Sequence, residues 1–380
     1  MAIRFSDFVT LQRGFDLTKT DMQSGPFPVI GSTSIIGYHD KFKVEPPGVV
    51  IGRSGSLGTV QLVTRRYWPH NTSLWVKDFK GNDPRFVYYC LQGMDFTRFN
   101  AGAGVPTLNR NHLDTLEVEI PTLPVQQRIA GILSAYDELI ENSQRRASIL
   151  EAMARAVYCE WFVDFRFSGD EKVSLIASAL GEIPAGWIVR SIEQFGAVIT
   201  GKTPSKDNAA FYGDDMPFVK TPDMNGNMFI LDTNDGLSTA GAGSQANKTL
   251  PAGSICVTCI GTIGTVSITT EACQTNQQIN SVKLADPACR EFLFFRLRDA
   301  KRRLENLGSN GATMANVNKA KFATMEVVCP PDDILARYHV VVAPMFAQIL
   351  HLAHQVQNLR KTRDLLLPRL LSGQIDVEAA

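Results

Sequence analysis

The 380-residue sequence predicts an α/β (α+β) fold in which two similar globular domains are separated by two long helices that pair as an antiparallel coiled coil. Two long stretches carry apolar residues every three or four positions, which is the spacing of a coiled-coil seam. These stretches match each other, since Tyr338 follows Ile129, and Leu370 follows Trp161, by the same 209 residues. The segments before them also repeat in order. This pseudo-twofold internal repeat predicts two similar ligand sites.

The first half of the chain is predicted to hold a globular domain at residues 1–123 and a long helix at residues 124–166. Short β-branched segments separated by Gly, Pro and Asn predict short strands joined by tight turns. Pro84 suits the first turn of a helix that continues to Leu91. At 1.5 Å per residue, the long helix should span roughly 60 Å. Its seam consists of Ile129, Leu133, Tyr136, Ile140, Ser143, Ala147, Leu150, Ala154, Val157 and Trp161.

The second half repeats this order after a linker at residues 167–182, with a domain at 183–330 and a helix at 331–380. Gly55-Ser-Leu-Gly-Thr-Val60 corresponds to Gly261-Thr-Ile-Gly-Thr-Val266, and the offset drifts only from 206 to 209 residues, so few insertions are expected. Pro344 is expected to kink the second helix or delay its start, and Pro368 to disturb its last turn. The second seam consists of Tyr338, Val342, Met345, Ile349, Leu352, Val356, Leu359, Arg363, Leu366 and Leu370.

Composition limits the class of protein and its partners. The 38 basic and 38 acidic residues cancel, so any binding of a polyanion must come from local clusters of charge. Seven cysteines, an odd number without framework spacing, indicate a reducing cytoplasm. No uninterrupted apolar run reaches membrane-spanning length, and the first residues lack the features of a signal peptide. We therefore expect a cytoplasmic protein with no membrane partner.

Several motifs together resemble one known family. The most specific are Gly48-Val-Val-Ile-Gly-Arg-Ser-Gly-Ser-Leu-Gly58, Trp68-Pro-His-Asn-Thr-Ser-Leu74, Gly104-Val-Pro-Thr-Leu-Asn109, Trp161-Phe-Val-Asp-Phe165 and Leu365-Leu-Leu-Pro-Arg-Leu-Leu-Ser-Gly373. In their order and spacing they resemble the specificity subunit of type I restriction–modification enzymes, over essentially the whole chain. The family often begins its first domain with a lead-in like Glu182-Ile-Pro-Ala-Gly-Trp187. Because this chain begins almost directly at Phe5, its first domain is expected to be slightly shortened.

The resemblance implies a function and a set of partners. Each domain would be a target-recognition domain that reads one half of a split site in double-stranded DNA, and the two helices would act as a ruler between the halves. The chain would be non-catalytic and hold no cofactor of its own. Two modification subunits would carry S-adenosylmethionine and methylate adenine, and restriction subunits would translocate and cut DNA with ATP and Mg²⁺. The exposed flanks of the two seams would bind the modification subunits, one per half.

Four other chemical signatures are weaker than they first look. Gly196-Ala-Val-Ile-Thr-Gly-Lys-Thr203 matches the P-loop pattern, but no helix-forming apolar face follows it. Gly52-Arg-Ser-Gly-Ser-Leu-Gly58 precedes a predicted strand, where a dinucleotide site needs a helix. Cys256 and Cys259 form half a zinc pattern and are better explained as small apolar residues on one strand face. An adenine methyltransferase would need Asp or Asn, then Pro-Pro and an aromatic residue, which the sequence lacks.

Polar residues able to reach base edges occur at corresponding places in the two halves, since Arg pairs with guanine and Asn or Gln with adenine. His70-Asn-Thr-Ser73 roughly corresponds to Asn276-Gln-Gln278. The predicted DNA contacts are Arg53, Ser54, Ser56, His70, Asn71, Thr72, Lys202, Thr203, Lys220, Thr262, Asn276, Gln277, Gln278 and Arg302. A coiled-coil scaffold whose two heads bind protein or glycan, and not DNA, is the alternative.

Overall fold

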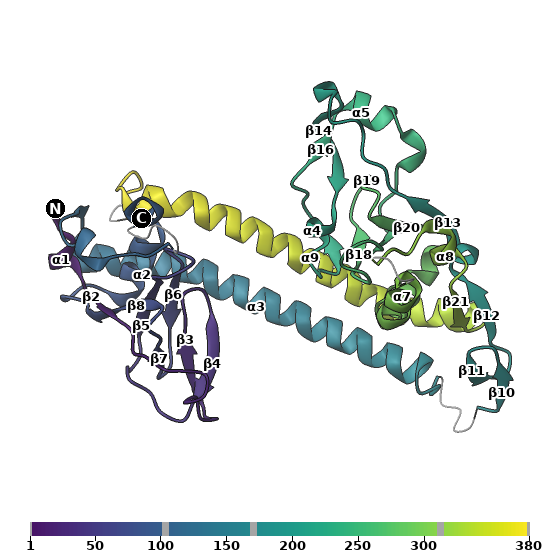
Figure 1. Ribbon diagram of the computed structural model, residues 1–380, viewed down its shortest axis with the longest axis horizontal. Helices are drawn as coiled ribbons and strands as arrows, with labels where there is room; N and C mark the ends of the chain where they lie inside the picture. The colour runs from purple at the N-terminus through teal and green to yellow at the C-terminus, as the bar shows by residue number, and fades with distance from the viewer. Residues whose placement is uncertain (1, 101–105, 168–172, 310–314, 378–380) are drawn as a thin grey trace. The chain divides into compact units, whose positions relative to one another are not determined.

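The computed structural model describes residues 2–100, 106–167, 173–309 and 315–377, and it divides into two compact units. Unit 1 consists of Met1–Asn142 and Val356–Ala380, and unit 2 of Ser143–Gln355. Residues Gly104 and Val105 of the third family motif and most of the first half of the predicted linker lie outside the described residues. Figure 1 labels many of the helices and strands of each unit.

Among its described residues, unit 1 contains three small sheets, two short α-helices and two 3₁₀ helices. The strands are β1 (Ala2–Arg4), β2 (Thr10–Arg13), β3 (Phe27–Ile30), β4 (Ile35–His39), β5 (Gly48–Gly52), β6 (Val60–Val63), β7 (Trp68–Pro69), β8 (Ser73–Asp78) and β9 (Glu117–Glu119). They form sheets in the orders β1-β9, β2-β8-β5-β6 and β4-β3-β7. The helices are α1 (Phe5–Phe8), α2 (Pro84–Gln92) and the 3₁₀ helices η1 (Thr97–Phe99) and η2 (Arg110–His112).

Helix α2 shows how the sequence sets a local element in unit 1. The Asp83 carboxylate accepts hydrogen bonds from the backbone N–H groups of Arg85 and Phe86, both at 2.9 Å, so it caps the helix that Pro84 begins. The apolar face of α2 is buried and packs against β5 and β6 (Figure 1). The helix predicted to begin at Pro84 is therefore confirmed.

Unit 2 repeats this arrangement with more elements. Its strands are β10 (Leu175–Ser178), β11 (Gly181–Pro184), β12 (Ile188–Ser191), β13 (Gly196–Thr200), β14 (Tyr212–Val219), β15 (Phe229–Ile230), β16 (Gly236–Leu237), β17 (Ile255–Thr258), β18 (Val266–Thr269), β19 (Gln274–Thr275), β20 (Ile279–Leu284) and β21 (Glu326–Cys329). They form sheets in the orders β10-β11, β12-β21, β13-β20-β17-β18-β15 and β16-β14-β19. The helices are η3 (Ile192–Phe195), η4 (Ala209–Phe211), α4 (Thr221–Met224), α5 (Thr239–Gly243), η5 (Ala246–Lys248), η6 (Pro287–Cys289), α6 (Arg290–Asp299), α7 (Lys301–Gly308) and α8 (Lys319–Ala323).

The strand registers confirm the repeat and correct the expectation of few insertions. Val29 pairs with Trp68 in parallel, as Phe218 pairs with Gln274. Yet the distance along the chain differs. Phe218 precedes Cys256 of β17 by 38 residues, whereas Val29 precedes Val50 of β5, which is equivalent to Cys256, by only 21. Unit 2 therefore holds 17 additional residues, in the stretch that contains α4, β15, α5 and η5. The motifs that match between the two halves all follow this stretch in the chain, so their nearly constant offset could not reveal the additional residues.

Two long helices complete the units, α3 (Leu123–Phe162) and α9 (Asp332–Leu371). Each has 40 residues, and they begin 209 residues apart. In unit 1 the early part of α3 lies antiparallel to the late part of α9, because Arg128 donates to the carbonyl of Val377 (2.9 Å) and Arg363 pairs with Asp137 further along α3. In unit 2 the ring of Phe162 packs on Tyr338 with centroids 4.7 Å apart. The predicted helix pairing is therefore present within each unit.

Helix α9 is continuous through both of its prolines. The expected delay of its start at Pro344 is wrong, since the helix already begins at Asp332. Pro344 removes the hydrogen bond to the carbonyl of Val340, whose side chain is 73% exposed, so water can serve that carbonyl instead. Among the described residues, α9 is also the one helix that is long and apolar enough for a membrane span. A core helix passes the same test, and Val342 and Phe346 are core residues of unit 2.

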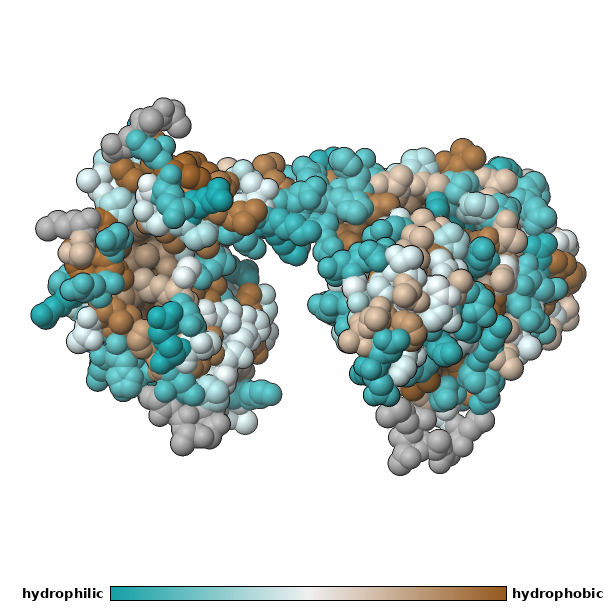
Figure 2. Space-filling view, turned by 90° about the horizontal axis from the view of Figure 1, so that it is seen from above, coloured by the Kyte–Doolittle hydropathy of each residue, from teal (hydrophilic) through white to brown (hydrophobic). Residues whose placement is uncertain are grey.

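The core of each unit lies where its sheets, its short helices and parts of both long helices meet. In unit 1 this core joins Phe5, Phe8 and Phe86 to Leu133 and Leu370. Unit 2 has a larger core, rich in aromatic residues from α3, α6 and α9. On the visible face of each unit, Figure 2 shows mostly hydrophilic residues with hydrophobic ones scattered among them. Polar loops at the ends of the strands are thus held on a well-packed scaffold.

Candidate nucleic-acid interface

A tight turn after β5 forms the first part of the candidate interface in unit 1. The N–H of Gly58 donates to the carbonyl of Gly52 (3.1 Å), and the N–H of Gly52 to that of Thr59 (2.8 Å). Gly55 and Gly58 have φ values of 82° and 79°, a conformation that favours glycine. The turn leaves Ser56 exposed at its tip. The motif thus makes a turn and not a dinucleotide site.

A second loop, His70 to Thr72, lies directly against this turn. The backbone N–H groups of Arg53 and Ser54 both donate to the carbonyl of Thr72, at 3.0 and 3.2 Å, and the Arg53 side chain donates to the carbonyl of Asn71 at 3.3 Å. The structure therefore brings together all six predicted contact residues of unit 1, which are Arg53, Ser54, Ser56, His70, Asn71 and Thr72.

The side chains of Arg53, His70, Asn71 and Thr72 all make hydrogen bonds within unit 1. Both ring nitrogens of His70 are in hydrogen-bond contact, Nδ1 with Thr72 Oγ1 at 2.9 Å and Nε2 with the carbonyl of Leu17 at 3.1 Å. The Asn71 side-chain amide donates to Asp16. His70 and Asn71 therefore hold the loop in shape, and as base contacts they remain predictions.

The sequence reasoning missed a basic groove beside these loops. It has a volume of about 630 Å³ and is lined in part by Arg13, Arg53, Asn109 and Arg110. Arg110 donates to the carbonyl of Leu11 at 3.3 Å, which ties η2 to β2. A signal was present, because Asn109 and Arg110 belong to a segment that repeats in the second half. Asp16 also lines the groove and pairs with Arg13, so three guanidinium groups face one carboxylate, an excess of positive charge that suits phosphate oxygens or guanine edges.

Unit 2 builds the same backbone scaffold. Cys259 N–H donates to the carbonyl of Gln278 (2.8 Å), as Arg53 N–H does to Thr72, and Gly264 N–H donates to Thr258 (2.9 Å), as Gly58 does to Gly52. The turn around Thr262 and the loop from Asn276 to Gln278 therefore correspond to the turn and loop of unit 1. Sequence correspondences between the halves predicted this placement correctly.

The side chains on this second scaffold are mostly bonded to one another. Thr203 Oγ1 donates to Gln277 Oε1 at 2.6 Å, and the Asn276 amide donates to Gln278 Oε1 at 3.0 Å. Lys220 forms an ion pair with Asp235, which sequence reasoning did not foresee. These contacts bring Thr203 and the loop from Asn276 to Gln278 into one cluster, so the amide groups present a fixed pattern of donors and acceptors.

Besides Gln277, three predicted contacts of unit 2 are exposed, namely Lys202, Thr262 and Arg302. Lys202 lies beside the loop, because its backbone N–H donates to the carbonyl of Thr275 at 2.9 Å. Thr262 lies at the tip of the turn, and Arg302 lies on α7. A Cβ placed on Gly264 would lie 3.1 Å from the Cα of Lys301, so the start of α7 adjoins the turn. The structure therefore brings Arg302 to the same region.

A buried network that the sequence did not reveal supports the Lys202 segment. The Gln245 side-chain amide donates to the carbonyl of Lys202 and to Gln274 Oε1, both at 2.8 Å. Gln274 in turn donates to the carbonyl of Ala242 at 2.9 Å. Gln245 belongs to the stretch of additional residues in unit 2, and both glutamines are buried. This stretch therefore fixes the backbone next to an exposed lysine.

The P-loop match and the pair Cys256 and Cys259 lie at strands β13 and β17 of unit 2. Most of the P-loop match is strand β13, which pairs with β20, so its backbone N–H groups cannot form a phosphate-binding nest. Cys256 and Cys259 lie in different clusters, not on one strand face as expected, because residues three apart on a strand point to opposite sides. Burial raises the pKa of Cys256 to about 12 and that of Cys259 to about 11. Within the described ranges no group of three or more His, Cys, Asp or Glu could hold a metal ion.

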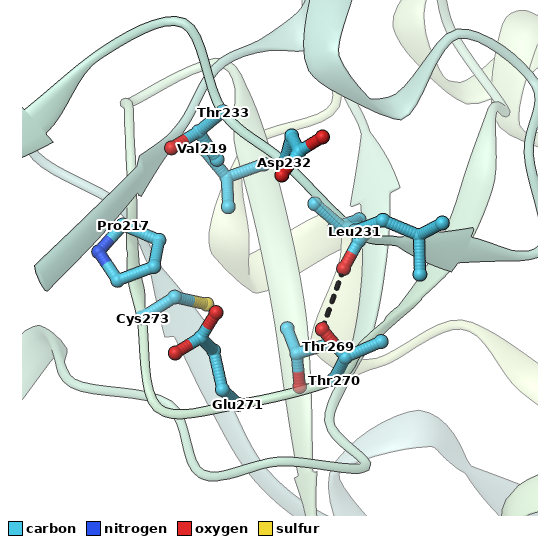
Figure 3. A pocket seen from close by; sticks show the side chains of 10 residues that line it. Pro217, Val219, Leu231, Asp232, Thr233, Thr269, Thr270, Glu271 and Cys273 are labelled. Carbon is cyan, nitrogen blue, oxygen red and sulfur yellow. Dashed lines mark hydrogen bonds between the residues drawn. The ribbon is translucent and has the colours of Figure 1, made fainter. Parts of the chain in front are cut away.

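A separate cavity of about 190 Å³ lies elsewhere in unit 2 (Figure 3). Pro217, Val219 and Cys273 give it an apolar part, and Asp232 and Glu271 add carboxylates. Its edge is fixed by a hydrogen bond from Thr270 Oγ1 to the carbonyl of Ile230 at 2.7 Å. None of the predicted contact residues lines this cavity, so it is not part of the candidate interface.

Comparisons with known proteins agree with one another. The family model described as the type I restriction modification DNA specificity domain matches residues 2–152 and 184–337. The chain is 32% identical to the type I restriction enzyme HindI specificity subunit of Haemophilus influenzae, over 77% of each chain. It is 25% identical to the MjaIX specificity subunit of Methanocaldococcus jannaschii, over 77% of this chain and 69% of that one. The fold matches the crystal structure of a type I restriction–modification S subunit from M. genitalium with a TM-score of 0.68 and 16% identity, covering 97% and 95% of the two chains.

Proposed function

Because the chain belongs to the family of type I restriction–modification specificity subunits, which recognise DNA, we propose that it reads a two-part site in double-stranded DNA, one half with each unit. The observation that carries the proposal is the repeated scaffold. In each unit a glycine turn is hydrogen-bonded to a polar loop, through Arg53 and Thr72 in one and Cys259 and Gln278 in the other. The same backbone carries different side chains, as expected of domains that read different bases.

The proposal includes a division of labour within the complex. This chain selects the DNA, two modification subunits methylate adenine with S-adenosylmethionine, and restriction subunits use ATP and Mg²⁺. In support, the sequence lacks the Pro-Pro-aromatic motif that holds a flipped adenine. We place the complex in the cytoplasm, and all seven cysteines are free thiols. The two 40-residue helices would set the spacer, since duplex DNA repeats every ~34 Å.

A footprint of the complex with its modification subunits tests the proposal. We expect two protected half-sites separated by a spacer whose sequence does not matter. One continuous site with sequence preference throughout would contradict it. The alternative, a scaffold with protein- or glycan-binding heads, is not favoured, because the matching family and relatives are specificity subunits. The scaffold alternative also predicts that retention on duplex DNA does not depend on salt, whereas contacts with phosphates predict a strong dependence on salt.

Replacing Lys202 by alanine should weaken DNA binding without revealing any ATP site. Lys202 is exposed beside the polar loop, and loss of one phosphate contact should lower affinity a few-fold and reduce the slope of log affinity against log salt by about one. The control is Lys283→Ala, since Lys283 is exposed and pairs with Ala197 at the other end of β13. Saturable ATP binding by the unaltered chain would restore the P-loop interpretation.

Equivalent exposed positions on the long helices are expected to bind the modification subunits. Ile132 on α3 and Val341 on α9 lie 209 residues apart and are 38% and 43% exposed. A buried carboxylate is costly at an apolar interface, so Ile132→Asp and Val341→Asp should each weaken one modification subunit roughly tenfold or more. Native mass spectrometry would then show complexes with one modification subunit. Leu175→Asp, on the β10–β11 hairpin, is the control and should leave both bound.

A further inference from the structure

The β3–β4 hairpin of unit 1 carries three large apolar side chains that are exposed. Ile35, Ile36 and Tyr38 in β4 are 42%, 45% and 47% exposed. Successive residues of a strand point to opposite faces, so both faces of β4 present isoleucine to the outside. Resting on the function proposed above, we propose that this hairpin enters the major groove of the DNA and that Ile35 and Ile36 contact thymine methyl groups.

The hairpin is fixed directly to the candidate interface. The Ser32 hydroxyl lies 2.7 Å from the carbonyl oxygens of both Ser54 and Thr72, which belong to the turn and the loop. Its own turn is closed by a hydrogen bond from Gly31 N–H to the carbonyl of Ser34 at 2.9 Å. DNA contacts made by the hairpin turn would therefore keep a fixed geometry relative to DNA contacts made by Arg53 and the loop from His70 to Thr72.

Ile36 lies next to this anchor. A Cβ placed on Gly31 would lie only 2.6 Å from Cγ2 of Ile36, so the isoleucine side chain covers the backbone of Gly31. Ile35 pairs with Ile30, whose carbonyl accepts the backbone N–H of His70 at 2.9 Å. Both isoleucines therefore adjoin the loop that holds the predicted base contacts, and they extend the polar cluster with an apolar surface.

Basic residues beside the same hairpin suit the DNA backbone. The Arg65 guanidinium lies 5.7 Å from the centroid of the Tyr38 ring and donates to its hydroxyl at 3.4 Å. The Arg66 guanidinium lies 4.8 Å from the Phe42 ring, although Arg66 also pairs with Glu45. Apolar residues next to the loop of predicted base contacts, with guanidinium groups beside Tyr38 and Phe42, match a groove bordered by phosphates.

Among its described residues, unit 2 has no apolar hairpin at the corresponding place. There Lys220 follows β14 as Gly31 follows β3, and the chain enters the short helix α4 instead of a hairpin. The neighbouring Thr221 hydroxyl donates to Gln278 Oε1 at 3.4 Å, a side chain and not a carbonyl. The apolar contact is therefore specific to one unit, and its loss should affect one half-site alone.

The test uses the full complex with its modification subunits and the double variant I35S/I36S. Duplexes are selected from a random pool, and thymine is then replaced by deoxyuracil, position by position, in the preferred site. We expect the unaltered complex to lose affinity when one thymine methyl in one half-site is removed, while the variant does not respond. The variant itself should bind the preferred site about tenfold more weakly, the cost of roughly one mismatched base pair.

Ile176→Ser is the matched control, because Ile176 is 46% exposed on the β10–β11 hairpin. A double variant that binds equally tightly and keeps every thymine preference overturns the inference. So does a double variant that loses modification subunits instead of DNA, since the hairpin would then be a protein-binding surface. Arg53→Ala distinguishes failure of the hairpin inference from failure of the proposed function. If Arg53→Ala weakens DNA binding while I35S/I36S does not, only the hairpin inference fails. If neither change affects DNA binding, the proposed function fails as well.

Discussion

Phe292→Ala should lower the free energy of unfolding of unit 2 by about 3–5 kcal/mol, the range for removing a large aromatic side chain from a core. Phe292 is fully buried on α6 and packs on three rings, those of Phe162 (4.8 Å), Phe195 (6.2 Å) and Tyr158 (6.4 Å). Its loss leaves a cavity where α6 meets α3. Thermal unfolding followed by circular dichroism should show the transition of this unit roughly 10 °C lower.

Met153→Ala is the control for this loss of stability. Met153 is also in unit 2, on α3, but its side chain is 49% exposed. Truncating it removes little buried surface, and the cost should stay within about 0.5 kcal/mol. If both variants lower the unfolding temperature by similar amounts, the packing of Phe292 among aromatic rings does not stabilise unit 2 more than an exposed side chain does.

Asp137→Ala should destabilise unit 1 by about 2 kcal/mol. The Asp137 carboxylate accepts a hydrogen bond from the Tyr89 hydroxyl at 2.6 Å and pairs with Arg363, so it joins α2, α3 and α9. Loss of the carboxylate leaves the buried Tyr89 hydroxyl unpaired and leaves the partly buried Arg363 guanidinium with Asp364 as its remaining acidic partner. The full cost of breaking a buried ion pair is reduced here, because the Asp137 and Arg363 side chains are 31% and 18% exposed. Denaturant titration of the full chain measures it.

Unit 2 supplies the control for this variant. At the positions equivalent to Tyr89, Asp137 and Arg363 it has Phe295, Phe346 and Ala154, all buried and packed together.

Transferring this apolar set, as the triple variant Y89F/D137F/R363A, should recover most of the stability that D137A loses, since apolar replacement of an ion pair is often neutral or better. A triple variant less stable than D137A would show that the polar contacts stabilise unit 1 by themselves.

The sequence predicted the parts of this fold that depend on regular spacing. The seam residues Ile129 and Leu133 are buried, and so are their counterparts Tyr338 and Val342. Such regularity is visible because each buried position of a helix recurs every three or four residues. The additional residues of unit 2 could not be found in this way, because α5 and η5 are short, glycine-rich or polar, and have no counterpart in the first half.

The candidate interface was predictable in its backbone but not in its side chains. Repeated glycine turns located the loops, because positive φ angles leave a clear mark in sequence. Whether a polar side chain is free depends on residues distant in the chain, such as Asp235 for Lys220 and Leu17 for His70. The exposure of Ile35 was hidden for a similar reason, since a β-branched residue in a short strand is read as buried.

Unit 1 is discontinuous in the chain, and this sets the order in which a ribosome can complete the two units. Its core includes Leu366, Leu370 and Val377, which are synthesised after the whole of unit 2. Unit 2 is a single continuous segment that ends at Gln355 and is available for folding earlier. The strands of unit 1 must therefore wait for the final turns of α9, and unit 1 matures after unit 2 during translation.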